Sequence, residues 1–286
     1  MSKRYLVTGS GLGLRRSFLR KLQPQSLDGV DFMEVAPENW IDVGGQFGRQ
    51  FRQISESQTF VCHGLSLNLG GPAALDEPFV YRIKKFLDEH EIKCYSEHLS
   101  YCCDDGHLYD LMPIPFTEEA VKYVSARIQR TQDILERRIA IENVSYYCAP
   151  GAEMSEIEFL NAILSEADTE LLLDINNIYV NSINHRYDPV AYMYALPADR
   201  IAYGHIAGHY EEADDLMVDT HGADVTDKVW DLLDLAYKHF GVFPTLLERD
   251  FNIPPISKLL SEVAHIGEVQ QRYLGDASQH DVVSHG

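Results

Sequence analysis

The sequence predicts an α/β protein that folds as one (β/α)8 barrel. Short β-rich runs alternate with longer segments of helical periodicity, which is typical of parallel strands joined by helices. Eight such runs occur within the 286 residues, and barrels of this length commonly form one domain. Seven of the eight runs carry a His, Asp, Glu or Asn residue at the last or next-to-last position, as expected of the active-site rim of a barrel.

The predicted strands are short and mostly apolar, as buried parallel strands are. Each needs a crossover segment before the next parallel strand. In chain order the predicted strands are Tyr5–Val7, Phe32–Val35, Phe60–His63, Lys93–His98, Ile139–Asn143, Leu171–Ile175, Ile201–His205 and Thr245–Glu248.

Helices are predicted where apolar residues recur at spacings of three and four. These segments are Phe79–His90, Glu118–Glu136, Glu156–Glu166 and Asp227–Phe240. Thr117 and Thr226 can cap helix starts, and Ser155 with Glu158 forms a capping-box pattern. Gly241 follows the last of these helices, where a glycine commonly ends a helix.

The domain organisation is predicted to be simple, because no internal repeat and no Pro/Gly/Ser-rich linker divides the chain. Residues 1–274 are expected to form a single barrel domain. Residues 275–286 carry no periodicity and are expected to form a flexible C-terminal tail. His280 and His285 lie in this tail and are expected to be exposed rather than bound to metal.

The expected compartment is the cytoplasm. The first residues lack the apolar core of a secretory signal, and no run approaches the roughly 20 apolar residues of a membrane span. The five cysteines are odd in number and have no framework spacing, which fits reduced thiols. We therefore expect no membrane partner.

The formal net charge is −20, which bears on the class of partner. Binding nucleic acid needs clustered Lys and Arg, so no nucleic-acid partner is expected. The carboxylates could belong to an acidic surface, or some could be buried as metal ligands and compensated by cations. Composition alone leaves both interpretations open.

The ends of the predicted strands carry the candidate chemistry. In a barrel these ends lie at one rim, so residues far apart in the sequence are expected to converge there. A lone His or Asp at such a position is commonly a structural residue with a satisfied partner, but seven or eight on one rim predict a site for several metal ions. The His, Asp and Glu candidates at or near the strand ends are Glu34, His63, Glu97, His98, Glu142, Asp174, His205 and Glu248, with Asn143 beside Glu142, and Asp219 and His221 lie in the long segment after the seventh strand.

The residue types restrict the metal. No cysteine is among them, which disfavours structural zinc and iron–sulfur clusters, whereas imidazoles and carboxylates suit iron, manganese or catalytic zinc. Eight candidates exceed the needs of one ion with open positions, so bridging carboxylates would let two or three ions share the set. Ligand chemistry alone leaves the choice of metal open.

Asn176, His209 and a glycine-rich segment allow more than one interpretation. Asn176 could join Asp174 through its amide oxygen, or it could serve a turn with Asn177. His209 could orient a ligand, face the substrate or itself be a ligand. The segment Gly9-Ser-Gly-Leu-Gly13 lacks the Gly-x-Gly-x-x-Gly spacing of a dinucleotide loop, so we expect a tight turn after the first strand and no nucleotide cofactor.

Seven short motifs occur in an order that resembles a known family. They are His63-Gly-Leu-Ser-Leu, Ser96-Glu-His98-Leu-Ser, Ile141-Glu-Asn143, Asp174-Ile-Asn-Asn177, His205-Ile-Ala-Gly-His209, Asp219-Thr-His221-Gly and Glu248-Arg-Asp. Together they resemble the multinuclear non-heme iron-dependent oxidative enzymes, which include the oxidase of methanobactin biosynthesis. The resemblance runs from Gly11 to about Ile256.

The resemblance implies a xylose-isomerase-like barrel that binds two or three irons. The eight ligands that it implies are His63, His98, Glu142, Asp174, His205, Asp219, His221 and Glu248, with Asn176 as a further candidate. It implies an oxidoreductase that uses dioxygen to modify cysteine residues of a ribosomally made precursor peptide in natural product biosynthesis. It also implies a partner protein that helps present the peptide. The alternatives are a zinc- or manganese-dependent hydrolase or sugar isomerase on the same barrel, and a non-catalytic metal-binding or assembly protein.

Overall fold

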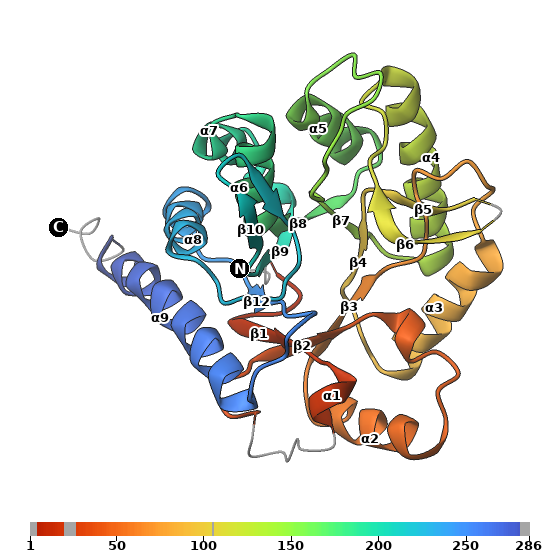
Figure 1. Ribbon diagram of the computed structural model, residues 1–286. Helices are drawn as coiled ribbons and strands as arrows, with labels where there is room; N and C mark the ends of the chain where they lie inside the picture. The colour runs from red at the N-terminus through yellow and green to blue at the C-terminus, as the bar shows by residue number, and fades with distance from the viewer. Residues whose placement is uncertain (1–4, 20–26, 105, 281–286) are drawn as a thin grey trace.

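A closed barrel of eight parallel strands forms the centre of the protein (Figure 1). The structure is a computed structural model and describes residues 5–19, 27–104 and 106–280. The barrel order is β1-β12-β9-β8-β7-β4-β3-β2, and Gly11 of β1 pairs with Leu246 of β12 and Phe32 of β2 to close it. The strands are β1 (Ser10–Gly13), β2 (Phe32–Val35), β3 (Phe60–Gly64), β4 (Tyr95–His98), β7 (Ala140–Glu142), β8 (Glu170–Asp174), β9 (Ile201–Ile206) and β12 (Thr245–Leu247).

Helices surround the strands and bury their apolar faces against the outside of the barrel (Figure 1). They are α1 (Arg16–Leu19), α2 (Gly45–Ser55), α3 (Glu77–Glu89), α4 (Glu118–Leu135), α5 (Glu156–Glu166), α6 (Ile175–His185), α7 (Pro189–Tyr194), α8 (Asp227–Phe240) and α9 (Ile256–His280), with 3-10 turns at Pro37–Asn39 and Ala198–Arg200. The predicted bounds are confirmed for α5 and α8, and those of α3 and α4 differ by one or two residues.

The predicted helix caps are mostly confirmed. Thr117 accepts a hydrogen bond from the backbone N–H of Ala120, and Ser155 forms the full capping box with Glu158. Gly241 ends α8 with a φ of 80°, a conformation that glycine adopts without strain. Thr226 precedes α8, but its side chain makes no capping hydrogen bond.

The first predicted strand was wrong. Residues 5–7 form a bend, and the strand is Ser10–Gly13, within the glycine-rich segment that we expected to be a turn. A Cβ built on Gly11 would lie 2.6 Å from the ring of Phe32. The buried Phe32 ring inside the barrel therefore requires a strand without a side chain at this point.

Two hairpins that the sequence did not predict extend from the carboxyl-terminal side of the barrel. One consists of β5 (Tyr101–Cys103) and β6 (His107–Met112), and follows β4. The other consists of β10 (Tyr210–Ala213) and β11 (Leu216–Val218), and follows β9. Both therefore belong to the loops that carry the active site in barrels of this kind.

The C-terminal segment is only partly described. α9 continues to His280, beyond the expected domain end at residue 274, while residues 281–286 lie outside the described residues. The flexible tail over 275–286 thus stays a prediction. Among the described helices, none combines the length and apolar character that crossing a membrane requires.

Two layers of side chains fill the barrel interior. The layer nearer the strand starts consists of Val7, Phe32, Val61, Cys94, Ala140, Leu172, Tyr203 and Leu246. Side chains two residues apart on a strand point to the same face. The residues two positions further along six of these strands are therefore also directed inward, one layer closer to the carboxyl-terminal rim.

Candidate metal centre

The second interior layer is polar and forms the candidate metal centre. It contains Glu34, His63, Glu142, Asp174, His205 and Glu248, all of which are buried. Each of them follows a residue of the apolar layer by two positions, so the alternation of the strand delivers the polar side chain to the rim. The barrel thereby brings together residues separated by up to 214 positions in the sequence.

His63, His98 and Glu142 form the first subsite. The Nε2 atoms of the two histidines lie 3.2 Å apart. Glu142 Oε2 lies 3.4 Å from His63 Nε2 and 3.3 Å from His98 Nε2. Donors that share an ion at about 2.0–2.2 Å lie about 3–3.5 Å from each other, so these three atoms have the spacing of ligands to one metal.

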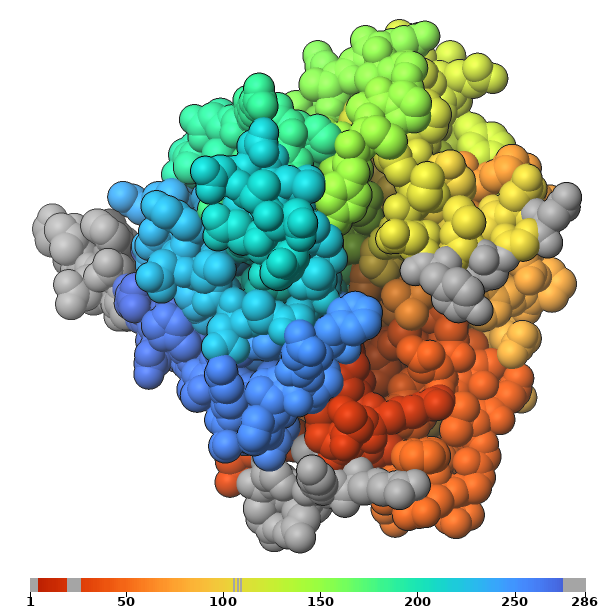
Figure 2. Space-filling model, in the orientation of Figure 1, coloured from red at the N-terminus to blue at the C-terminus, as the bar shows by residue number. Residues whose placement is uncertain are grey.

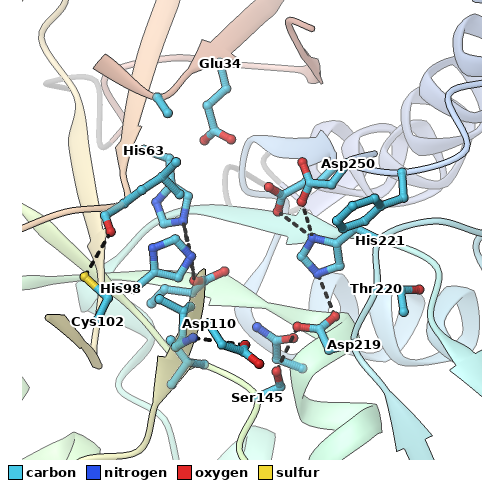
Figure 3. A pocket seen from close by; sticks show the side chains of 18 of the residues that line it. Glu34, His63, His98, Cys102, Asp110, Ser145, Asp219, Thr220, His221 and Asp250 are labelled. Atoms are coloured by element: carbon cyan, nitrogen blue, oxygen red, sulfur yellow. Dashed lines mark hydrogen bonds and ion pairs between the residues drawn. The ribbon is translucent and has the colours of Figure 1, made fainter. Parts of the chain in front are cut away.

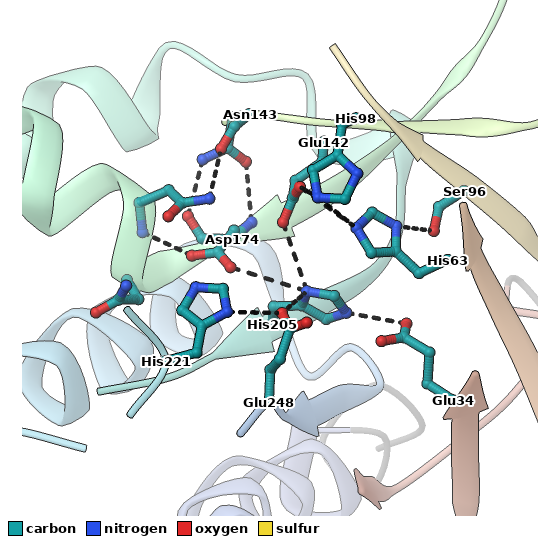
Figure 4. A network of polar contacts seen from close by, with 12 residues as sticks. Glu34, His63, Ser96, His98, Glu142, Asn143, Asp174, His205, His221 and Glu248 are labelled. Atoms are coloured by element: carbon teal, nitrogen blue, oxygen red, sulfur yellow. Dashed lines mark hydrogen bonds and ion pairs between the residues drawn. The ribbon is translucent and has the colours of Figure 1, made fainter. Parts of the chain in front are cut away.

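The second subsite surrounds the Nδ1 atom of His205. This atom lies 3.0 Å from Glu248 Oε2, 3.5 Å from Glu142 Oε1 and 3.8 Å from Asp174 Oδ2. Glu142 therefore faces the first subsite with Oε2 and the second with Oε1 (Figure 4). A carboxylate in this position can bridge two ions.

The third subsite lies around His221, next to the second. His221 Nε2 lies 2.7 Å from Asp219 Oδ1, and His221 Nδ1 lies 3.1 Å from Asp250 Oδ2 and 3.4 Å from Glu248 Oε2 (Figure 3). His221 has a φ of 47°, a conformation that costs a non-glycine residue on the order of 1–2 kcal/mol. Such local strain commonly persists where function requires a particular side-chain position.

The structure thus brings all eight predicted ligands to one rim. Asp250 joins them in a group with His221 and Glu248 whose ligand atoms all lie within 4.8 Å of one another. Sequence reasoning missed Asp250, although the residue stands in the quoted Glu248-Arg-Asp motif. Its position two residues after Glu248, beyond the end of β12, was the available signal.

Burial and neighbouring charges shift several pKa values in this layer. Burial alone would raise the pKa of Glu142, but His98 and His63 lower it below its ordinary value. Burial would lower the pKa of His98, but mainly Glu142 raises it to about 10. Burial, with the nearby Glu142 carboxylate, raises the pKa of Asp174 well above its ordinary range. These opposed shifts show strong mutual interaction of carboxylates and imidazoles in a space from which water is largely excluded.

A metal fits this donor set. Two buried oxygens here, Asp174 Oδ2 and Asn177 Oδ1, have no hydrogen-bond partner within the described residues, and the buried His205 Nδ1 and His221 Nε2 face carboxylates. Buried polar atoms ordinarily have partners, and the clustered carboxylates need compensating positive charge. Imidazole nitrogens and carboxylate oxygens are ligands for iron, manganese and zinc.

The two neighbouring asparagines differ in their surroundings. Asn176 Nδ2 donates to Asp219 Oδ1 at 2.9 Å, and Asn176 Oδ1 lies 2.8 Å from His209 Nδ1. Asn176 therefore supports Asp219, with His209 behind it. Asn177 lines the cavity, and its Oδ1 atom is the one without a partner. The geometry thus favours Asn177 over the predicted Asn176 as an additional oxygen ligand.

The centre opens into a cavity of about 640 Å³, and Figure 2 shows the face of the molecule hollowed near its middle. Exposed apolar side chains stand around the opening, among them Leu65, Leu108, Tyr147 and Phe251. Arg15 also lines the cavity, with its Nε atom 3.0 Å from Asp250 and its Nη2 atom 3.4 Å from Glu248. The cavity thus combines an apolar entrance with a polar floor, as ligand sites commonly do.

Fold and donor set together define the class of protein: an α/β barrel with a candidate multi-metal centre at its carboxyl-terminal rim. The chain matches the family described as RiPP precursor modification enzyme MbnB/TglH/ChrH over residues 9–271, and it belongs to that family. This agrees with the resemblance carried by the seven motifs. The family and the fold indicate an enzyme, and the family name implies a precursor peptide as substrate.

Relatives with high sequence identity cover nearly the whole chain. A UPF0276 protein of Shewanella sediminis is 62% identical over 91% of this chain and 94% of its own length. A UPF0276 protein of Pseudomonas aeruginosa is 54% identical over 94% of this chain and 95% of its own length.

Solved structures of low identity share the fold. An L-ribulose 3-epimerase gives a TM-score of 0.63 at 13% identity, covering 98% of this chain and 100% of its own. The IOLI protein, solved with a binding zinc atom, gives 0.58 at 14% identity over 92% of this chain and 99% of its own. These similarities establish the xylose-isomerase-like barrel.

Proposed function

We propose that the protein binds two or three iron ions at this centre and, with dioxygen as the oxidant, modifies cysteine residues of a ribosomally made precursor peptide. The observation that carries this proposal is the position of Glu142, whose two oxygens face different subsites. Glu142 would therefore contribute to both subsites, as expected of a centre for more than one ion. Family membership supports the peptide substrate.

In this proposal His63, His98 and Glu142 would hold the first ion, and Glu142, Asp174, His205 and Glu248 would hold the second. Asp219 and His221, with Asp250, would hold a third. Iron bound there would supply a Lewis-acidic position for a thiolate and electrons for the reduction of dioxygen. Arg15 orients Glu248 and Asp250 through its hydrogen bonds, while Asn176 and His209 orient Asp219.

The cavity would admit the peptide. Its apolar entrance, with Leu65, Leu108 and Phe251 exposed, can bury apolar side chains of an extended segment while a cysteine reaches the polar floor. We also propose a cytoplasmic location, where precursor peptides are made and thiols stay reduced. A partner protein that presents the peptide is part of the same proposal.

The test uses the full chain, purified without oxygen and loaded with Fe²⁺. The probes are synthetic peptides, and their sequences are those of any short cysteine-containing reading frames found next to the gene of this protein. Exposure to air is expected to consume dioxygen and to change the peptide mass at a cysteine, as located by tandem mass spectrometry. Peptides with Ser in place of Cys are expected to remain unchanged.

A pair of matched variants checks that the centre is responsible. Asp174→Asn is expected to abolish peptide modification, because it removes a buried carboxylate of the second subsite. Asp168→Asn is the control, since Asp168 is exposed just before β8, where it pairs with Arg138 and Arg200, and it should retain activity. Equal activity of both variants would point to a non-catalytic or assembly role for the centre.

The main alternative is a zinc- or manganese-dependent hydrolase or isomerase, as some proteins of this fold are epimerases by name. Metal analysis of the active protein separates the two. Full turnover with zinc alone and without dioxygen consumption would contradict the oxidative proposal.

A further inference from the structure

A continuous line of hydrogen-bonding groups connects the first subsite to the second inside the barrel. His63 Nδ1 lies 2.7 Å from Ser96 Oγ, which lies 2.7 Å from the hydroxyl of Tyr203. That hydroxyl lies 2.7 Å from Glu34 Oε2, and the same oxygen lies 3.0 Å from His205 Nε2. All five side chains are buried, and Figure 4 shows the contacts at both ends of the line.

The donors and acceptors along this line follow from the chemistry of its last member. A carboxylate oxygen accepts hydrogen bonds, and Glu34 Oε2 lies within hydrogen-bond distance of the Tyr203 hydroxyl and of His205 Nε2, so it accepts from both. The Tyr203 oxygen is then available as an acceptor for the Ser96 hydroxyl. Ser96 in turn accepts from the Nδ1–H of His63. Each donation therefore leads toward Glu34.

Opposite ring nitrogens of the two histidines are left for the metals. His63 Nε2 faces His98 and Glu142 in the first subsite. His205 Nδ1 faces the carboxylates of the second subsite, 3.0 Å from Glu248 Oε2 and 3.5 Å from Glu142 Oε1. An outer hydrogen bond that fixes the proton on one nitrogen of a ligand histidine determines which nitrogen binds metal.

We propose that Glu34, acting directly on His205 and through Tyr203 and Ser96 on His63, is a shared positioning residue that sets opposite tautomers in two metal subsites. This inference rests on the proposed metal centre. Tyr203 and Ser96 are positioning residues as well, because neither faces the cavity. One carboxylate thus controls the orientation of ligands for two ions, although it belongs to neither proposed ligand set.

The first test measures the tautomers in the zinc-loaded protein. Zn²⁺ is diamagnetic, so long-range proton–nitrogen NMR spectra of protein labelled with ¹⁵N-histidine can report which ring nitrogen carries hydrogen. The spectra are expected to show Nδ1–H for His63 and Nε2–H for His205. The same tautomer at both residues would overturn the proposal, whereas failure of Zn²⁺ to bind at all would count against the metal centre itself.

The second test separates the two branches with variants. Tyr203→Phe removes the hydroxyl that links His63 to Glu34 but leaves the contact between Glu34 and His205. It is expected to weaken one Zn²⁺ site by about tenfold in chelator competition, at the lower end of the effect of losing an outer partner. Glu34→Gln is expected to weaken two sites, because both branches end on this carboxylate.

Tyr237→Phe provides a matched control. Tyr237 is buried, and its hydroxyl lies 2.6 Å from Thr245 Oγ1, outside the line. The Tyr237→Phe variant therefore loses a comparable hydrogen bond, but its zinc affinity should equal that of the unaltered protein. Ser96→Ala interrupts the branch from Glu34 to His63 by a smaller change. It takes the place of Tyr203→Phe if the Tyr203→Phe variant does not fold. Wild-type zinc affinity and an unchanged His63 signal in a folded branch variant would refute the positioning role.

Discussion

Among single residues, Glu142 is the one whose carboxylate faces both the first and the second of the proposed subsites. Its two oxygens face His63 and His98 on one side and His205 on the other. Because those histidines come from three different strands, this carboxylate also links distant parts of the barrel. Its loss should therefore affect more than one subsite.

Glu142→Gln is expected to lower metal affinity by more than the roughly 10–100-fold that loss of an outer partner costs. The amide carries no charge and replaces one acceptor oxygen with a donor group. Metal per chain, measured after dialysis against a chelator, is expected to fall in both the first and the second subsite. Glu170→Gln, a change at the amino-terminal end of β8, should keep the full metal content.

At this scale the sequence predicts which residue types reach the rim but not how each side chain is turned. Six of the eight candidate ligands converge because they lie at the ends of parallel strands, and strand ends are visible in the sequence. Asp219 and His221 instead follow β11 in the segment after β9. Asn176 and Asn177 are adjacent and chemically identical, so only the hydrogen bonds of Asn176 to Asp219 and His209 distinguish them. The role of Glu34 depends on Tyr203, 169 positions away, which no local pattern indicates.

Among the elements, strand β1 has the least usual sequence. Its residues Ser-Gly-Leu-Gly have low strand propensity, and for this reason the sequence favoured the more apolar Tyr5–Val7. Pairing with β2 and β12 on both sides keeps this segment extended. Such tertiary pairing overrides local propensity, and a single sequence carries little sign of it.

Gly11→Ala is expected to lower the free energy of unfolding by about 1–3 kcal/mol, the usual cost of overpacking a core. The new Cβ would lie 2.6 Å from the Phe32 ring, which has no exposed surface. Denaturant unfolding measures the change, and adding Phe32→Leu should recover part of it. Gly106→Ala, where a Cβ meets open space, should change stability by no more than about 0.5 kcal/mol.

Helix α5 begins with Glu156, whose carboxylate is enclosed by its neighbours. Glu156 Oε1 accepts a hydrogen bond from the Tyr192 hydroxyl at 2.8 Å, whereas Oε2 is buried without a partner among the described residues. Burial raises the pKa of Glu156 to about 7. The folded protein therefore binds a proton here that the unfolded chain releases at a lower pH.

The stabilising contribution of protonated Glu156 should thus be complete below pH 4.5 and disappear as pH rises through about 7. Glu156→Gln keeps the neutral form at every pH. As pH rises from 4.5 to about 7, the free energy of unfolding of this variant is therefore expected to increase by about 1–3 kcal/mol relative to that of the unaltered protein. Urea unfolding at a series of pH values measures this difference. A pH-independent difference would contradict the assignment.

Glu158, two residues further along α5, makes stability depend on pH in the opposite direction. Its hydrogen bonds with Ser155 lower the pKa of Glu158, so its contribution to stability is present at neutral pH and lost in acid. Glu158→Gln should therefore be the less stable variant at pH 7, and the two slopes can be compared in one set of measurements.

For the whole molecule, the closed barrel and its single polar rim could be predicted from the sequence. The eight short apolar runs predict the barrel, and the His, Asp, Glu and Asn residues near the ends of most runs predict the polar rim. Parallel strands all point the same way, so their carboxyl ends meet at one rim. The hairpins β5–β6 and β10–β11 could not be predicted in this way. They are short and belong to loops, where periodic patterns are weak.

The barrel is closed by pairing between β1, at residues 10–13, and β12, at residues 245–247. The proposed second subsite needs Glu248, which directly follows that last strand. During synthesis on the ribosome, the histidines and carboxylates made earlier therefore remain without this neighbour until residue 248 has emerged. Complete metal loading of the proposed centre would for this reason follow the closure of the barrel.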